Sequence, residues 1–380
     1  MDPLKEFKQN LEYHFSEVTG RPYAKPHWIF ISLSHECTFK CQMCGVVNVL
    51  KGHSLSNGDV HKMLDEIAGW GRDCVVLFTG GEPFLRKDIF DLISYSVRKG
   101  LKTEAVSNGS LITEALATKI VHSGLQNIAI SLDGKNEKTH DTVRQKGAFV
   151  KATTALKNLA DAKKKAGAGP EISAWTTIMK ENVDELYDMI PLAKSLGVEC
   201  LVYHPVVVAQ DDMQNTSPQA PFWIREEMLP VLKEQIDKIV EYKNEHGLVA
   251  FLHDPHLWVE HFRGGLTKKQ WKCNPFVFLN IGPDGEVRSC GASFGNISEG
   301  GLEHCLTSPE AHKARAIMKQ CQKPCLQTCW AHPGSDSLTK LSENFLRQIG
   351  GRKDKDELLN EAQQTIEEYE TKLLEKPRDA

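Results

Sequence analysis

The sequence lacks any long hydrophobic run and any strong excess of one charge. Its longest apolar stretches, at 28–33 and 75–78, are far shorter than the roughly 20 residues that cross a bilayer. The first residues lack the apolar segment of a signal peptide. The formal net charge is −4, from 46 basic and 50 acidic residues, without a basic face or an acidic tail. These absences argue against a membrane span and a nucleic-acid partner, and predict a soluble, cytoplasmic protein.

Cysteine, by contrast, is abundant, with 11 residues in a chain of 380. Structural disulfides are rare in a reducing cytosol, so the clustering of these cysteines points to metal binding. Cys74 and Cys200 are exceptions, because they lie in apolar runs that predict core positions. The clustered cysteines form two groups, one of Cys37, Cys41 and Cys44 and one of Cys273, Cys290, Cys321, Cys325 and Cys329.

Short β-branched runs alternate with helical periodicity over the first half of the chain. Continuous apolar runs are typical of parallel strands that are covered on both faces. Six strand–helix units in series predict right-handed crossovers and an α/β fold, a partial (βα)6 TIM-type barrel. The strands are expected at 28–33, 74–79, 102–107, 126–132, 171–179 and 198–204.

The alternation of strand-like and helix-like segments ends at about residue 210. A hairpin is expected where 276–281 and 286–288 flank the turn 282–285. An apolar stripe through the last residues predicts a helix that packs on the body of the protein. The expected organisation is a lead-in at 1–26, the barrel at 27–210, a linker and helix at 211–272, a small cysteine-rich unit at 273–335 and a helical tail at 336–380.

The first cysteine group follows the first predicted strand, so it lies at the carboxyl end of the barrel, where active sites are built. Three thiolates can hold three irons of a [4Fe-4S] cluster and leave the fourth iron open to an amine and a carboxylate. A zinc site formed by Cys37, Cys41 and Cys44 with His53 is the alternative.

The run Ser-His-Glu-Cys-Thr-Phe-Lys-Cys-Gln-Met-Cys at 34–44 resembles the cluster-binding loop of the radical S-adenosylmethionine superfamily. The resemblance covers about 27–210. It implies that S-adenosylmethionine binds the open iron and is cleaved reductively to a 5′-deoxyadenosyl radical. This radical would abstract hydrogen from a substrate carbon. An electron donor of the flavodoxin or ferredoxin type is implied as a partner.

Polar residues follow the next three predicted strands in the family's order. Gly80-Gly81-Glu82-Pro83 resembles the motif that binds the amino group of the cofactor, and Asn108 resembles a ribose-binding residue. Arg144 resembles an arginine that pairs with the cofactor carboxylate, as a guanidinium can. An ordinary turn at 107–109 and a surface arginine are the alternatives. The resemblance implies cofactor binding by Gly80, Gly81, Glu82, Pro83, Ser107, Asn108, Ser131, Asp133 and Arg144.

The second cysteine group resembles the auxiliary-cluster extensions called SPASM and Twitch. It has five cysteines where the full extension uses about seven, so one auxiliary [4Fe-4S] cluster is expected. Cys273 and Cys290 are the firmest ligands, followed by Cys329, whereas Cys321 and Cys325 compete for the fourth position. Four thiolates would favour electron transfer and three would leave an iron for substrate. A structural zinc is the alternative.

The expected activity is a net oxidation or rearrangement of a small metabolite, such as a sugar, nucleoside, lipid or tetrapyrrole. Only about 27 residues precede the first strand, too few for the leader-binding module of many peptide-modifying relatives. A peptide- or protein-modifying maturase is the alternative, and a non-catalytic electron carrier or a zinc-binding protein is less favoured. His204 ends the sixth strand and could be catalytic, although a structural rim histidine is the commoner case.

Overall fold

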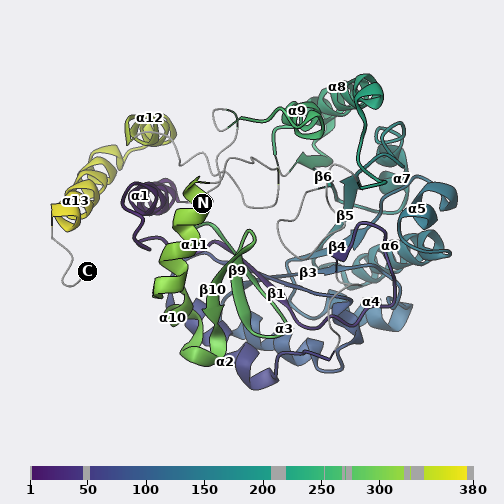
Figure 1. Ribbon diagram of the computed structural model, residues 1–380, viewed down its shortest axis with the longest axis horizontal. Coiled ribbons are helices and arrows are strands. Elements are labelled where there is room, and N and C mark those ends of the chain that lie inside the picture. Colours follow the sequence, from purple (N-terminus) through teal and green to yellow (C-terminus); the bar gives the residue numbers. More distant parts are fainter. Residues whose placement is uncertain are drawn as a thin grey trace.

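The computed structural model describes residues 2–45, 52–206, 220–251, 253–267, 270, 276–320, 326 and 338–374. Within these residues all strands belong to one ten-stranded sheet, in the order β10-β9-β8-β1-β2-β3-β4-β5-β6-β7. Figure 1 shows the sheet as a curved wall with helices along its outer side. The pairs from β1 to β7, and the pair β8–β1, are parallel. The prediction of a parallel, TIM-type α/β sheet is confirmed.

Six strands agree with the predicted barrel strands to within two residues at each end, two form the predicted hairpin, and two are additional. They are β1 (Trp28–Ser32), β2 (Val75–Thr79), β3 (Lys102–Ser107), β4 (Asn127–Ser131), β5 (Glu171–Ile178), β6 (Cys200–Pro205), β7 (Val249–Phe251), β8 (Phe278–Ile281), β9 (Glu286–Ser289) and β10 (Ala292–Asn296).

The helices of the barrel begin and end largely as their caps predict. Ser56, for example, accepts a hydrogen bond from the Asp59 N–H and so starts the second helix. The α-helices are α1 (Pro3–Thr19), α2 (Asn57–Gly69), α3 (Ile89–Arg98), α4 (Glu114–Val121), α5 (Glu137–Val143), α6 (Ala148–Ala166), α7 (Met189–Ser195), α8 (Leu229–His246), α9 (Leu257–Arg263), α10 (Gly301–Thr307), α11 (Pro309–Gln320), α12 (Leu338–Ile349) and α13 (Lys355–Leu374).

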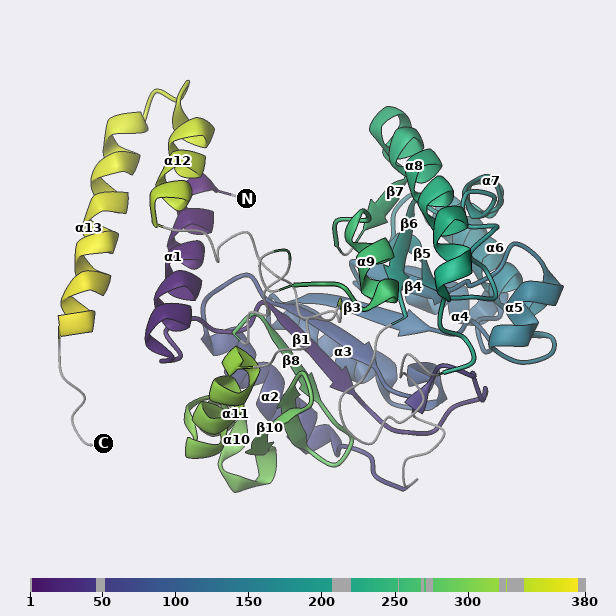
Figure 2. The same ribbon diagram turned by 45° about the horizontal axis from the view of Figure 1, so that its top comes forward.

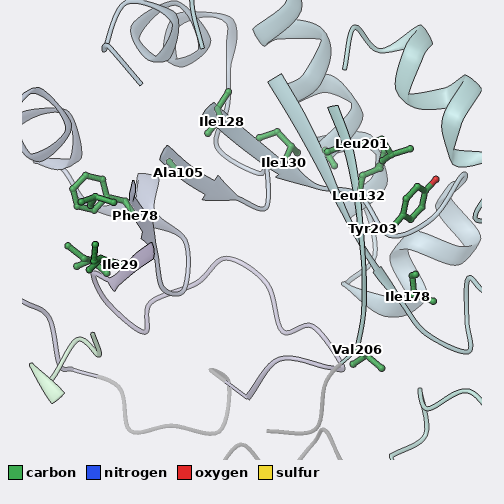
Figure 3. Packing of buried hydrophobic residues seen from close by; sticks show 14 of the residues in the cluster. Ile29, Phe78, Ala105, Ile128, Ile130, Leu132, Ile178, Leu201, Tyr203 and Val206 are labelled. Atoms are coloured by element: carbon green, nitrogen blue, oxygen red, sulfur yellow. The ribbon is translucent and has the colours of Figure 1, made fainter. Parts of the chain in front are cut away.

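The main core lies between the sheet and these helices. Alternate residues along each strand point outward, because successive side chains of a strand point to opposite faces. Ile29, Phe78, Ala105 and Ile130 belong to this outer layer and are fully buried, as Figure 3 shows. Their neighbours along the strands, such as Phe30, face the inside of the barrel.

β7 and β8 continue the parallel sheet on either side of the six barrel strands. β7 falls in the stretch expected to be a linker and helix, and it pairs with β6. β8 falls in the cysteine-rich unit, yet it pairs in parallel with β1, and the rings of Phe30 and Phe278 meet edge to face at 4.7 Å. The cysteine-rich unit is therefore joined to the barrel through a continuous sheet.

The two ends of the chain form a helical unit of their own. α1 packs against α12 and α13, with Phe7 stacked on Phe345 and Phe15 stacked on Tyr369. Figure 2 shows the three helices side by side, apart from the barrel helices. Among the described residues, the apolar stripe of α13 thus packs on α1. No helix among the described residues has the length and apolarity that a membrane crossing requires.

The inner face of the barrel contains a half-buried carboxyl group at Glu104. In the register of β2, β3 and β4 it lies between Leu77 and Asn127. Burial raises the pKa of Glu104 to about 7, and the nearby Glu171 adds to this effect. The folded protein therefore binds the Glu104 proton more tightly than the unfolded chain does. This contribution to stability is complete below the ordinary glutamate pKa and is lost as the pH rises through about 7.

Replacing Glu104 with Gln should remove this pH dependence. At pH 8 we expect the variant to unfold with a free energy about 1–3 kcal/mol higher than the wild type, and at pH 5 with nearly the same value. Denaturant unfolding of the full chain at both pH values measures the difference. Glu241→Gln, at an exposed position of α8, is the control and should change neither value. A constant difference between Glu104→Gln and wild type at both pH values would refute the assignment.

Candidate active site

The loop that carries Cys37, Cys41 and Cys44 follows β1 and is held against the end of β2. The Gly81 N–H donates to the Ser34 carbonyl and the Glu82 N–H donates to the Glu36 carbonyl, both at 2.8 Å. A Cβ atom on Gly81 would lie 2.0 Å from the Glu36 oxygen, and one on Gly80 would lie 2.5 Å from the Ser34 oxygen. The two glycines are therefore required because the backbones touch here.

The three cysteines gather around one small apolar cluster. Cys41 is buried there with Phe39 and Ala148, and the other two cysteines pack against it. The Gln42 N–H donates to the Val143 carbonyl at 3.0 Å, which fixes the loop to the end of α5. Burial raises the pKa of the Cys41 thiol to about 11, although the Arg144 charge opposes this effect. An anionic sulfur at this position therefore needs a compensating positive charge.

Two side chains, one after β3 and one after α5, donate toward these sulfurs. The Asn108 amide nitrogen lies 3.6 Å from the Cys37 sulfur, and Arg144 Nη1 lies 3.8 Å from the Cys41 sulfur. Donors of this kind stabilise thiolates that bind iron and tune the cluster. Among the described residues no three cysteine, histidine or acidic side chains are close enough to hold a single metal ion. What the structure shows is three sulfurs in one apolar cluster, with two donors facing them.

Glu82 connects the ends of β2 and β3. Its carboxylate accepts hydrogen bonds from the Ser107 hydroxyl and the Asn108 N–H, both at 2.9 Å. The Phe84 N–H donates a third hydrogen bond to it, at 3.3 Å. Only 1% of Glu82 is exposed, and this burial raises its pKa to about 7 in spite of these hydrogen bonds. The structure thus brings three of the predicted cofactor-binding residues into one network. Pro83, the last residue of the motif, starts a short 3-10 helix.

Asp133 and Arg144 form a buried ion pair at the end of β4. Arg144 Nε donates to one carboxylate oxygen of Asp133, and the Thr177 N–H donates to the other at 2.8 Å. Burial acts against the charge of Asp133, but the charge of Arg144 together with the hydrogen bonds to the carboxylate holds the pKa below its usual value. Asp133 thus orients the Arg144 guanidinium toward Cys41, and the pairing of Arg144 with a cofactor carboxylate stays a prediction.

His140 and Asn182 hold this ion pair in place. The Asp133 N–H donates to His140 Nδ1 at 3.0 Å, which leaves the imidazole proton on Nε2. Burial lowers the pKa of His140 to about 4, so the ring is neutral. The Asn182 amide donates to the carbonyls of Asp133 and Thr177, at 2.8 and 2.9 Å. Sequence reasoning missed Asn182, whose only signal is a polar residue shortly after a strand.

His204 lies on the inner face of the barrel, beside β5. In the register of β5 and β6 it pairs with Thr177, whose hydroxyl is 3.3 Å from His204 Nε2. The Trp175 ring lies 6.1 Å from the imidazole, and Ser131 is the register partner of Trp175 on β4. Burial lowers the pKa of His204. These four residues form one wall near the ion pair.

Of the second cysteine group, the described residues include Cys290. Cys290 and Gly291 form the turn between β9 and β10, and Cys290 has a φ of 54°. This left-handed conformation is uncommon for a residue other than glycine. The other predicted ligands, Cys273, Cys321, Cys325 and Cys329, lie outside the described residues.

Comparison with known proteins agrees with this geometry. Residues 31–206 match the model of the Radical SAM superfamily. The AdoMet-dependent heme synthase of Methanosarcina barkeri is 31% identical over 47% of this chain and 50% of its own length. The subtilosin biosynthesis protein AlbA of Bacillus subtilis is 26% identical over 74% of this chain and 59% of its own. The crystal structure of Streptococcus suis SuiB bound to S-adenosylmethionine superimposes with a TM-score of 0.62, at 14% identity, over 78% of this chain and 68% of that one.

The match to the Radical SAM superfamily covers residues 31–206, which reach from the last residues of β1 to the end of β6, and agrees with the resemblance found in the sequence. This match supports a four-iron cluster and S-adenosylmethionine as the cofactors of the barrel. The chain spans about half the length of the first curated relatives that it matches, from 43% to 50%. The agreement with SuiB shows the fold, which is the predicted one.

Proposed function

We propose that this protein is an enzyme that cleaves S-adenosylmethionine reductively and oxidises or rearranges a small metabolite. The observation that carries the proposal is the loop of Cys37, Cys41 and Cys44. It is held by backbone contacts to Gly81 and Glu82, with two side-chain donors facing its sulfurs. The bound cluster and cofactor together supply one electron and a 5′-deoxyadenosyl radical that takes hydrogen from the substrate.

The residues of the chain have separable roles in this proposal. The three cysteines bind iron, and Asn108 and Arg144 stabilise the negative charge on sulfur. Glu82, Ser107 and Asn108 shape the edge where the ribose and amino groups of the cofactor bind, with Gly80, Gly81 and Pro83 setting the backbone. Asp133 orients Arg144, and Ser131 and His204 face the substrate space. The barrel wall excludes water from the reacting groups.

The cysteine-rich unit is proposed to hold an auxiliary four-iron cluster on Cys290 with Cys273, Cys329 and one of Cys321 and Cys325. Its support is the shared sheet, which connects β8 to β1, and the left-handed Cys290 at a turn where glycine would be unstrained. A second cluster near the barrel suits a reaction whose substrate radical must lose an electron.

Replacing Cys290 with Ala should distinguish the role of the auxiliary cluster from that of the barrel cluster. We expect the variant to lose about four irons per chain and to keep forming 5′-deoxyadenosine, with no modified substrate. Iron analysis and chromatography of the reaction products measure both effects. Cys200→Ala, on β6, is the control and should keep all of its iron. Wild-type iron content in Cys290→Ala would refute the auxiliary site.

A peptide substrate is the second candidate. The match to a bacteriocin biosynthesis protein extends over 74% of this chain, well beyond the barrel. A perdeuterated cell extract, separated by ultrafiltration into small molecules and polypeptides, distinguishes the two. Incubation of the loaded enzyme with each fraction and S-adenosylmethionine should place deuterium in 5′-deoxyadenosine with the small-molecule fraction. Labelling by the polypeptide fraction alone would overturn the preference for a metabolite.

A further inference from the structure

The two faces of the barrel sheet differ in how far they are covered. Along β1 and β3 every second residue is buried, and the residues between them stay partly exposed. The buried set includes Ile29 and Ala105, which pack outward against the helices (Figure 3). The partly exposed set includes Phe30 and Glu104, which therefore lie on the concave side of the sheet. The concave side is thus the side of these strands on which a ligand can reach side chains.

One row of side chains crosses this concave side from β8 to β5. The register of the strands places six residues side by side in the row: Asn280, Phe30, Leu77, Glu104, Asn127 and Glu171. Neighbouring strands lie about 4.8 Å apart, and side chains on a concave face converge, so the row forms one continuous surface. Its apolar centre is flanked by polar groups on both sides.

Glu104 is an acid of this row without a donor. Among the described residues it forms neither a hydrogen bond nor an ion pair, and Glu171 and Lys102 act on it through their charges alone. Glu171, by contrast, accepts a hydrogen bond from the Asn127 amide at 2.7 Å. The register partners of Glu104, Leu77 and Asn127, carry no charge. Because burial raises the pKa of Glu104 to about 7, a cation beside this carboxyl would hold it ionised.

Asn280 supplies a second acceptor without a donor, at the other end of the row. Its side-chain oxygen is buried and accepts no hydrogen bond within the part of the chain that the structure describes. A buried oxygen without a donor is costly, and native proteins retain few of them. Between Asn280 and Glu104 lies the ring of Phe30, which meets Phe278 edge to face. Aromatic rings attract a cation, so the centre of the row also suits one.

We propose that the substrate of this enzyme is a small cationic amine, whose ammonium group pairs with Glu104 and whose other N–H or O–H groups donate to the Asn280 oxygen. The inference rests on the proposed function and names its substrate class. Both acceptors lack donors, and an ammonium group supplies N–H donors together with a positive charge. Glu104 precedes the end of β3 by three residues, so the ammonium lies roughly 10 Å below the edge where the cofactor is proposed to bind. A small molecule can span that distance, and Glu104 selects the substrate without taking part in the hydrogen transfer.

The test separates the small molecules of a perdeuterated cell extract on a cation-exchange resin at neutral pH. Amines are retained, whereas neutral and acidic metabolites pass through. Each fraction is incubated with the loaded wild-type enzyme, dithionite and an excess of unlabelled S-adenosylmethionine, and mass spectrometry measures the share of 5′-deoxyadenosine that carries a single deuterium. We expect this label with the retained fraction. Acetylation of that fraction should remove the label, because it abolishes the charge of primary and secondary amines.

Glu104→Gln relates the label to this carboxyl group. The variant should fold, since loss of the acid stabilises the protein above neutral pH, and it should keep forming unlabelled 5′-deoxyadenosine. With the retained fraction its labelled share should fall about tenfold or more, and Glu104→Asp should restore part of it. Asn280→Leu should need a more concentrated fraction for the same labelled share. Glu241→Gln, at an exposed position of α8, is the control and should match the wild type.

The possible failures of this test are distinguishable. Label that the unretained fraction gives as strongly as the retained one, label from neither fraction, or label that survives acetylation would overturn the inference and leave cleavage of S-adenosylmethionine standing. An undiminished labelled share in Glu104→Gln would overturn it as well. A loaded wild-type enzyme that forms no 5′-deoxyadenosine in any reaction would instead overturn the proposed function, and the inference with it.

Discussion

Replacing Cys41 with Ala should abolish the formation of 5′-deoxyadenosine. Cys41 is the most buried of the three cysteines in the loop after β1, and Arg144 donates to its sulfur. With one of three ligands missing, the barrel cluster should not assemble, and the iron content should fall by about four per chain. The loss of activity should exceed the roughly 10–100-fold that removal of an outer-shell partner costs. Anaerobic assays of reconstituted protein measure both quantities.

Cys74→Ala is the matched control for this experiment. Cys74 is also buried, with 1% exposed, but its thiol donates to the Pro26 carbonyl at 3.4 Å. It lies immediately before the start of β2, whereas the loop is held at the end of that strand. Its replacement should cost about 1 kcal/mol of stability through lost packing and leave the iron content unchanged. Equal iron loss in both variants would mean that Cys41→Ala acts by unfolding the protein, and full iron in Cys41→Ala would remove it from the ligand set.

The second large effect is expected for Gly81→Ala. The added Cβ would lie 2.0 Å from the Glu36 carbonyl oxygen, a backbone atom next to Cys37. The strand end and the loop must then separate, with loss of the two hydrogen bonds between them. We expect a loss of about 3 kcal/mol or more in the free energy of unfolding, together with failure to assemble the barrel cluster. Denaturant unfolding and iron analysis measure these effects.

Gly69→Ala provides the control for the glycine experiment. Gly69 is the last residue of α2, and a Cβ there would meet no atom within 4 Å. The variant should be as stable as the wild type or slightly more stable, because alanine favours the helix, and it should load iron normally. If Gly81→Ala is equally well tolerated, the loop is not held against β2 as described.

The six strands of the barrel could be predicted because their signal is local. Runs such as 74–79 are apolar on both faces and end at turns, so the parallel sheet follows from the chain itself. β7 has only three residues, too few for a recognisable period. The hairpin of β8 and β9 was predictable, but the pairing of β8 with β1 depends on contacts some 250 residues apart, about which local periodicity carries no information. The packing of the apolar stripe of α13 on α1 could not be predicted either, because these two helices lie at opposite ends of the sequence.

The residues of the candidate site could also be predicted in part, whereas the contacts between them could not. Spacing and position after strands selected Cys37, Cys41, Cys44, Glu82, Asn108, Asp133 and Arg144 as candidates, and the structure brings these residues together at one edge of the sheet. What sequence could not predict is how they pair. Asp133 and Arg144 come from separate predicted contexts, and their ion pair depends on the short distance between the end of β4 and the residue that follows α5. Asn182 was not predicted as a site residue because asparagine is common in the turns that follow strands.

The central claim is that the loop of Cys37, Cys41 and Cys44 holds a cluster with one iron open to S-adenosylmethionine. The most direct measurement is anaerobic reconstitution of the wild-type protein, reduction with dithionite, addition of S-adenosylmethionine and quantification of 5′-deoxyadenosine and methionine. The account predicts both products in equal amounts. Fully iron-loaded protein that forms neither product, or protein that binds zinc in place of an iron–sulfur cluster at this loop, would contradict it.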